Sequence, residues 1–104
     1  MERFDHLLAT IIERRSGDPA TSYVAKLTAK GRPKMAQKLG EEAVEVVIAA
    51  ISDDKAGLVS ESADLMFHLA VLLADAGLSF DDVRAELERR EGVSGIEEKA
   101  KRST

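Results

Sequence analysis

Residues 65–74 read LMFHLAVLLA, an almost unbroken apolar run in which His68 is the one polar side chain. We expect this run to lie in a helix from about Lys55 to Ala76, with Gly77 as its C-terminal stop. A helix that is apolar on nearly every side is usually buried on nearly every side. A chain of 104 residues has too little material to cover such a helix alone. We therefore predict a homo-oligomer, most simply a homodimer, in which a second copy covers the remaining face.

The rest of the chain also shows helical patterns, separated by Gly, Pro, Ser and Asp clusters. An amphipathic pattern near the N-terminus predicts a first helix, and Ser22 and Gly31 bound a short second one that ends at Lys30. Further helices are expected from Pro33 to about Ser52 and, after a Ser79–Asp82 capping box, to about Glu91. The predicted fold is an all-α, up-and-down helical bundle of four main helices plus a short one. It forms a single domain over residues 1–104, with a polar tail over 92–104.

Composition excludes several classes of function. The absence of Cys excludes disulfides, thiolate metal sites and a cysteine nucleophile. The N-terminus lacks the apolar core of a signal peptide, and no apolar run approaches the roughly 20 residues of a membrane span. The net charge of −4 argues against general nucleic-acid binding. We expect a soluble, cytoplasmic protein that binds neither membranes nor nucleic acids.

Five of the acidic residues in the two central helices form two groups. In the first, Glu41, Glu42 and Glu45 share about one quarter of the helix surface, and in the second, Glu61 and Asp64 share one stripe. If the two helices form an antiparallel hairpin that turns near residue 53, Glu45 lies level with Glu61 and Glu42 with Asp64. Side chains from helices packed about 8–10 Å apart can reach a common point. The spacing therefore predicts two facing pairs of carboxylates.

Carboxylates held together away from water repel one another and need a compensating charge. An all-oxygen set of ligands favours a hard divalent cation, Mg²⁺ or Mn²⁺. Such a centre is typical of phosphate chemistry, in which the cation neutralises phosphate oxygens. The alternative for these acids is a solvated face without a ligand.

A basic segment without any acid directly precedes these acids, and it suits a phosphate substrate. Its cations are Lys26, Lys30, Arg32, Lys34 and Lys38. The alternative is that they are solvated surface side chains. Gly40 lies inside the predicted helix, where either a close helix crossing or a nearby ligand would account for it.

Two further side chains have two interpretations each. His68 either acts as a base or phosphate contact in the substrate site, or is a core histidine whose hydrogen bonds are satisfied. Tyr23 either stacks on a nucleotide base or packs against the next helix.

The pattern Glu41-Glu42-x-x-Glu45 followed by Glu61-x-x-Asp64 resembles the MazG-like all-α nucleotide pyrophosphohydrolase superfamily. Within it, the segments SYVAKL (22–27), QKLGEEA (37–43), DLMFHL (64–69), LERR (87–90) and SGIEEK (94–99) are similar to the phosphoribosyl-ATP pyrophosphatase family of histidine biosynthesis. The resemblance extends over nearly the whole chain, from about Phe4 to Arg102.

The resemblance implies Mg²⁺-dependent hydrolysis of phosphoribosyl-ATP to phosphoribosyl-AMP and diphosphate, in a homodimer and in the stand-alone form of the enzyme. It implies that the metal ligands are Glu42, Glu45, Glu61 and Asp64. Glu41 would bind a second metal or orient water, so that the expected catalytic residues are Glu41, Glu45 and Lys38. The expected substrate-binding residues are Lys34, Lys38, His68, Arg90 and Lys99, although the tail around residues 94–95 would alternatively pack across the dimer.

Two other functions remain open at this point. One is a house-cleaning (d)NTP pyrophosphatase on the same scaffold, and the other is a non-catalytic helical dimer that binds a partner.

Overall fold

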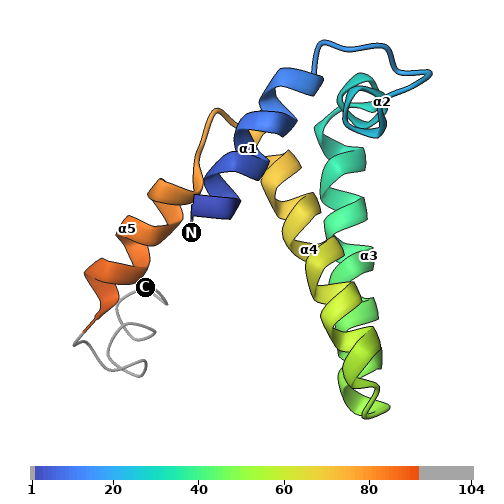
Figure 1. Cartoon of the computed structure of the whole chain (residues 1–104), viewed down its shortest axis with the longest axis vertical. Coiled ribbons are helices and arrows are strands. Elements are labelled where there is room, and N and C mark those ends of the chain that lie inside the picture. Colours follow the sequence, from blue (N-terminus) through green and yellow to red (C-terminus); the bar gives the residue numbers. More distant parts are fainter. Residues whose placement is uncertain (1, 92–104) are drawn as a thin grey trace.

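The computed structural model describes residues 2–91, which form five helices (Figure 1). They are α1 (Glu2–Arg14), α2 (Tyr23–Lys30), α3 (Arg32–Ile51), α4 (Lys55–Asp75) and α5 (Phe80–Arg90). The expected all-α bundle of four main helices and a short one is confirmed, and each of the four helices after α1 begins and ends within about two residues of the position expected. The tail over 92–104, and Lys99 with it, lies outside the described residues.

Local signals in the sequence account for the helix ends. The Ser22 hydroxyl caps α2, and Ser79 and Asp82 form the expected capping box at the start of α5. Gly77, with a φ of 73°, ends α4: its N–H donates to Ala74 O, and the next N–H, of Leu78, donates to Leu73 O. This pair of hydrogen bonds is a Schellman motif, which needs a left-handed residue that glycine supplies without strain.

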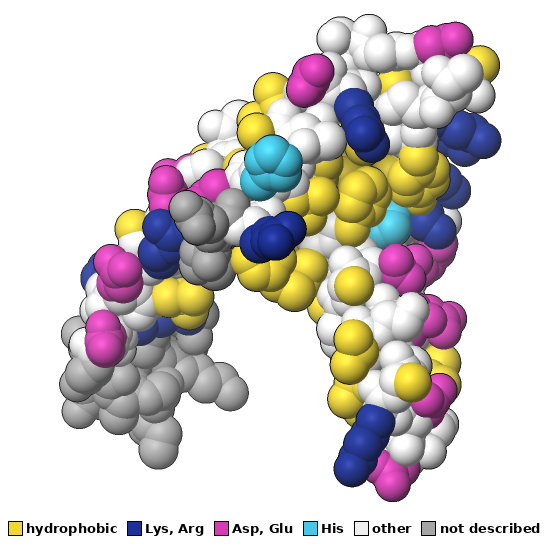
Figure 2. Space-filling view, viewed as in Figure 1, with side chains coloured by type: hydrophobic (Ala, Val, Ile, Leu, Met, Phe, Trp, Pro, Cys, Tyr) yellow, Lys and Arg dark blue, Asp and Glu magenta, His cyan; other side chains and the backbone are white. Residues whose placement is uncertain are grey.

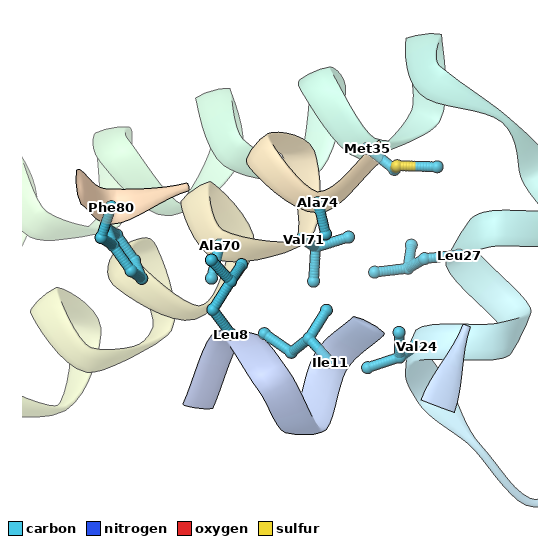
Figure 3. Close-up of a cluster of buried hydrophobic side chains, with 9 residues drawn as sticks. All are labelled: Leu8, Ile11, Val24, Leu27, Met35, Ala70, Val71, Ala74 and Phe80. Atoms are coloured by element: carbon cyan, nitrogen blue, oxygen red, sulfur yellow. The ribbon is translucent and has the colours of Figure 1, made fainter. Parts of the chain in front are cut away.

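The hydrophobic core lies at one end of the long α3–α4 hairpin, which we call the packed end. There α1 crosses α4 while α2 packs on α3 (Figure 1). Figure 3 shows the side chains that meet in this core, which come from all five helices. They are Leu8, Ile11, Val24, Leu27, Met35, Ala70, Val71, Ala74 and Phe80. The second half of α4 is therefore the central element of the core, as its apolar run predicts.

Two arginines fasten the packed end through one carboxylate. Asp75 accepts hydrogen bonds from Arg15 and from Arg32, each at 2.7 Å. Arg15 also donates to the carbonyl of Ala74 and Arg32 to the carbonyl of Asp75, both in the last turn of α4. Asp75 thus joins the ends of α1 and α4 to the start of α3.

The opposite end of the hairpin projects from the core as a two-helix arm (Figures 1 and 2). On α3, apolar residues at i, i+3, i+4 and i+7 are all more than half exposed, and we call them the arm stripe: Val44, Val47, Ile48 and Ile51. Val59 on α4 is 73% exposed.

By length and composition alone, α4 is long and apolar enough to cross a membrane. Core helices of soluble proteins meet the same two criteria. Only 17% of its most apolar window is buried within this chain, so α4 lacks the cover that a core helix requires.

Candidate functional site

The predicted hairpin between the two acidic helices is present. Ser52 ends α3, Asp53 adopts a left-handed conformation with a φ of 53°, and the Asp54 side chain caps α4 by accepting from Gly57 N–H. A turn of this length makes α3 and α4 antiparallel neighbours along their whole length. Their acidic residues are thereby brought to one side of the hairpin, where Figure 2 shows Asp and Glu side chains gathered.

Three of the predicted carboxylates form a tight group, which we call the acid cluster. One oxygen from each of Glu42, Glu61 and Asp64 lies within 4.8 Å of the others. Partial burial raises the pKa of Glu61, and the charges of Asp64, Glu42 and Glu45 raise it further. Glu45 is therefore close enough to act on the cluster electrostatically, although it is not one of the three grouped residues. A carboxylate oxygen of Glu42 lies near both Glu61 and Asp64. These three acids therefore form one group instead of the two separate facing pairs that the spacing predicts.

The acid cluster has the chemistry of a divalent-cation site. Its donors are all carboxylate oxygens, which suit hard cations such as Mg²⁺. After the larger effect of partial burial, repulsion from the neighbouring acids raises the pKa of Glu61, and a bound cation would offset that repulsion. The residues therefore fit the cation that the sequence pattern predicts.

Glu41 is not one of the three grouped acids, and it pairs with side chains of its own helix. It accepts a hydrogen bond from Gln37 Nε2 at 2.9 Å and one from Lys38 Nζ at 3.2 Å. The Gln37 hydrogen bond, followed by that of Lys38, lowers the pKa of Glu41, and the same pairing raises the pKa of Lys38. This ion pair holds the Lys38 ammonium group about one helical turn before the acid cluster.

A hydrogen-bonded chain links α2 to the acid cluster. His68 Nδ1 lies 2.8 Å from the carbonyl oxygen of Asp64, and Nε2 lies 2.9 Å from the Tyr23 hydroxyl. Because a carbonyl oxygen only accepts, Nδ1 carries the proton, and in a neutral ring Nε2 accepts from Tyr23. His68 is buried with both nitrogens occupied, which favours the interpretation of a satisfied core histidine. Tyr23 is 47% exposed, and its ring lies against Phe67 with centroids 6.2 Å apart.

The predicted basic residues surround a cavity of about 200 Å³ between α2 and α3, which we call the lysine cavity. Tyr23, Leu27 and Glu41 line it together with four lysines: Lys26, Lys30, Lys34 and Lys38. In Figure 2, Lys and Arg side chains lie next to the Asp and Glu side chains of the arm, on the side of α2. Arg32 does not join this cavity, because it pairs with Asp75 instead.

Two other candidates lie elsewhere. Arg90 is on α5, which packs against α1 and lies apart from α3, and it pairs with Glu86 at 3.0 Å. Within one chain, therefore, Arg90 is not brought to the acid cluster. Among the residues that the structure describes, nothing outside the helix's own backbone lies within 4 Å of a Cβ built at Gly40. A close helix crossing within one chain therefore does not account for that glycine.

The sequence interpretation missed two features of the site. Gln37 helps to hold Glu41, and its spacing four residues earlier on the same helix was the available signal. The Tyr23–His68 hydrogen bond joins residues 45 positions apart, and no spacing rule indicates it.

Comparisons with known proteins agree with this geometry. The sequence profile of the family described as phosphoribosyl-ATP pyrophosphohydrolase matches residues 4–91. A phosphoribosyl-ATP pyrophosphatase from Rhizorhabdus wittichii is 65% identical over 94% of this chain and 92% of its own length. Proteins of the same name from Erythrobacter litoralis and Novosphingobium aromaticivorans are 60% and 63% identical. The first covers 98% of both chains, and the second 93% of this chain and 91% of its own length.

Proposed function

Because the chain belongs to the phosphoribosyl-ATP pyrophosphohydrolase family, we propose that its reaction depends on Mg²⁺ bound at the acid cluster. The reaction is the hydrolysis of phosphoribosyl-ATP to phosphoribosyl-AMP and diphosphate, a step in L-histidine biosynthesis. The observation that carries this proposal is the convergence of Glu42, Glu61 and Asp64 within 4.8 Å. The reaction would take place in the cytoplasm.

In this proposal Glu42, Glu61 and Asp64 hold the cation, and Glu45 completes the ligand set from the adjacent turn of α3. When bound, the cation supplies charge neutralisation at the phosphate oxygens. The low pKa of Glu41 keeps it ionised, so that it can orient the attacking water by accepting a hydrogen bond. Lys38 and Lys34 stabilise the negative charge that develops on the leaving diphosphate.

The hydrogen-bonded chain through His68 acts as a support for Asp64. By bonding the Asp64 carbonyl and the Tyr23 hydroxyl, His68 ties α4 to α2 at the level of the cluster. Side chains that bind a metal need neighbouring groups to hold them in position, because a small displacement of such a side chain weakens metal binding.

We infer also that the enzyme is a homodimer in which the arm stripe and the uncovered face of α4 meet a second copy. The stripe has the spacing of a helix–helix interface, yet each of its residues is more than half exposed. A dimer would also allow Arg90 of a second copy to reach the substrate.

The direct test measures diphosphate release by the purified full chain from phosphoribosyl-ATP and from a panel of (d)NTPs, with Mg²⁺ and with EDTA. We expect rapid release from phosphoribosyl-ATP that EDTA abolishes and added Mg²⁺ restores. Faster turnover of the panel would instead indicate a house-cleaning pyrophosphatase, and release that continues in EDTA would refute the cation mechanism.

The dimer is tested by sedimentation velocity across a range of protein concentrations. We expect a species of twice the 11.3 kDa chain mass for the wild type and a shift toward monomer for Ile48→Glu. A wild type that stays monomeric at all concentrations would overturn the dimer.

A further inference from the structure

The lysine cavity has two chemically different ends. At the end nearer the acid cluster, Lys38 is neutralised by Glu41. At the other end, Lys26 and Lys30 lie one turn apart on α2, and neither forms an ion pair with any residue that the structure describes. The second end is therefore a concentrated positive charge without a counter-charge.

Such an arrangement calls for an anion. Four lysines and one glutamate line a space of about 200 Å³, so the lining carries an excess of positive charge that attracts anions. Lysine is a common ligand of phosphate groups, which it binds as a point charge. A cavity of this volume holds a phosphate with part of a sugar rather than a whole nucleotide triphosphate.

The position of the cavity indicates which phosphate it takes. Lys26 and Lys30 lie on α2, whereas the acid cluster, at which the phosphoanhydride bond is cleaved under the proposed function, is formed by α3 and α4. Phosphoribosyl-ATP carries, besides its triphosphate, one phosphate on its second ribose. That phosphate belongs to the phosphoribosyl group, which ATP lacks.

We propose that Lys26 and Lys30 bind the phosphate of the phosphoribosyl group and thereby select phosphoribosyl-ATP over ordinary nucleoside triphosphates. This inference rests on the proposed function, because it presupposes that the acid cluster takes the triphosphate. Tyr23 borders both the lysine cavity and a wider cavity of about 440 Å³ that extends to Phe67 and the α1–α2 connection. The rest of the nucleotide has room there, beside the exposed face of the tyrosine ring.

The two products, together with AMP, separate the phosphate groups and provide the test. Phosphoribosyl-AMP keeps the remote phosphate and the 5′-phosphate that cleavage leaves, AMP has only that 5′-phosphate, and free diphosphate is the leaving group alone. Binding of each is measured by calorimetry with Mg²⁺ for the full-length wild type, Lys26→Met, Lys30→Met and the double variant. Methionine keeps the length and helix propensity of lysine without its charge. Lys55→Met, at the exposed start of α4, is the matched control.

We expect the double variant to bind phosphoribosyl-AMP about 10- to 100-fold more weakly, the usual loss for a hydrogen bond to a charged group, with the affinities for diphosphate and AMP unchanged. Each single variant shows part of this loss, and Lys55→Met shows none. A loss confined to diphosphate would mean that these lysines hold the leaving group, and would overturn the proposal. Unchanged binding of both products, or a wild type that binds no phosphoribosyl-AMP, would overturn it as well.

The same samples distinguish this inference from the proposed function. If the wild type binds phosphoribosyl-AMP through Lys26 and Lys30 but releases no diphosphate from phosphoribosyl-ATP, the proposed function fails while the assignment of the lysines stands. If diphosphate release is rapid and the double variant loses no affinity for phosphoribosyl-AMP, only the assignment of the lysines fails.

Discussion

The two ends of the α3–α4 hairpin are made from the same two helices, yet they differ in how completely this chain covers them. At the packed end, α1, α2 and α5 bury side chains such as Ile11, Met35 and Val71 to 2% exposure or less. On the arm, the four residues of the arm stripe are at least 51% exposed. The comparison indicates that one chain forms its own core at the packed end, whereas it leaves the arm stripe uncovered, as the proposed dimer requires. The acid cluster lies on the arm side and the lysine cavity on the packed side, so the proposed substrate spans the boundary.

The largest expected effect is a loss of activity when the acid cluster on the arm side is altered. Asp64→Asn removes a carboxylate of the arm without removing any core contact, and it should lower Mg²⁺-dependent kcat/KM by about 100- to 1,000-fold, because a bound cation contributes several kcal/mol to charge stabilisation. Helical content, measured by circular dichroism, should not change. The control is Glu13→Gln, an exposed acid of α1 at the packed end, which should keep full activity. Activity retained in Asp64→Asn would remove the cluster from the mechanism.

The next prediction compares the same truncation at both ends. Ile11→Ala opens a cavity in the core, and such a change usually lowers the free energy of unfolding by about 2–5 kcal/mol. The melting temperature should then fall by more than about 10 °C. Ile48→Ala should instead raise the dimer dissociation constant about tenfold, as truncation of an interface residue does.

Thermal melts and sedimentation measure these two effects separately. If Ile48→Ala left association unchanged at every protein concentration, the arm stripe would not be the surface that a second copy covers.

A smaller effect is expected at Gly40, which lies on α3 between the two ends. A Cβ at this position meets no described atom, so Gly40→Ala should gain about 1 kcal/mol of helix propensity without a clash. The melting temperature should rise by about 4–8 °C in calorimetry. A fall in melting temperature would show that a second copy approaches the backbone closely at this point.

The smallest effect concerns α5 and pH. Hydrogen bonds from Arg89 and then Arg90 lower the pKa of Glu86 from its ordinary value of 4.5 to about 2. A carboxylate with a lowered pKa stabilises the folded state above its unfolded pKa, and this contribution is lost as the pH falls through the folded value. The difference in melting temperature between the wild type and Glu86→Gln should therefore be present above about pH 4.5 and should disappear toward pH 2. A difference that is constant over this range would mean that the charge of Glu86 has no part in it.

Much of the fold could be predicted because helix boundaries depend on nearby residues. Ser22, Ser79 and Gly77 act on backbone groups within four residues of themselves, and each ends or begins a helix where the sequence indicates. The convergence of Glu42 and Asp64 followed from the hairpin register in the same way, because the rise of a helix is constant.

The rest depended on contacts between distant segments. The spacing of residues in the sequence did not show that Arg32 pairs with Asp75 instead of lining the lysine cavity. It also did not show that His68 is hydrogen-bonded to Tyr23. The predicted hairpin register also paired Glu45 with Glu61, whereas in the structure Glu42 forms the tight group with Glu61 and Asp64.

The sequence by itself determined the helices, their order and the side of the hairpin on which the acids gather, because caps, periodicity and helical rise are local properties of the chain. Only the tertiary structure decided which side chains touch, and that the lysines of α2 and α3 enclose one cavity. The physical reason is that contacts across helices depend on packing angle and side-chain rotamer, which distant parts of the chain set together.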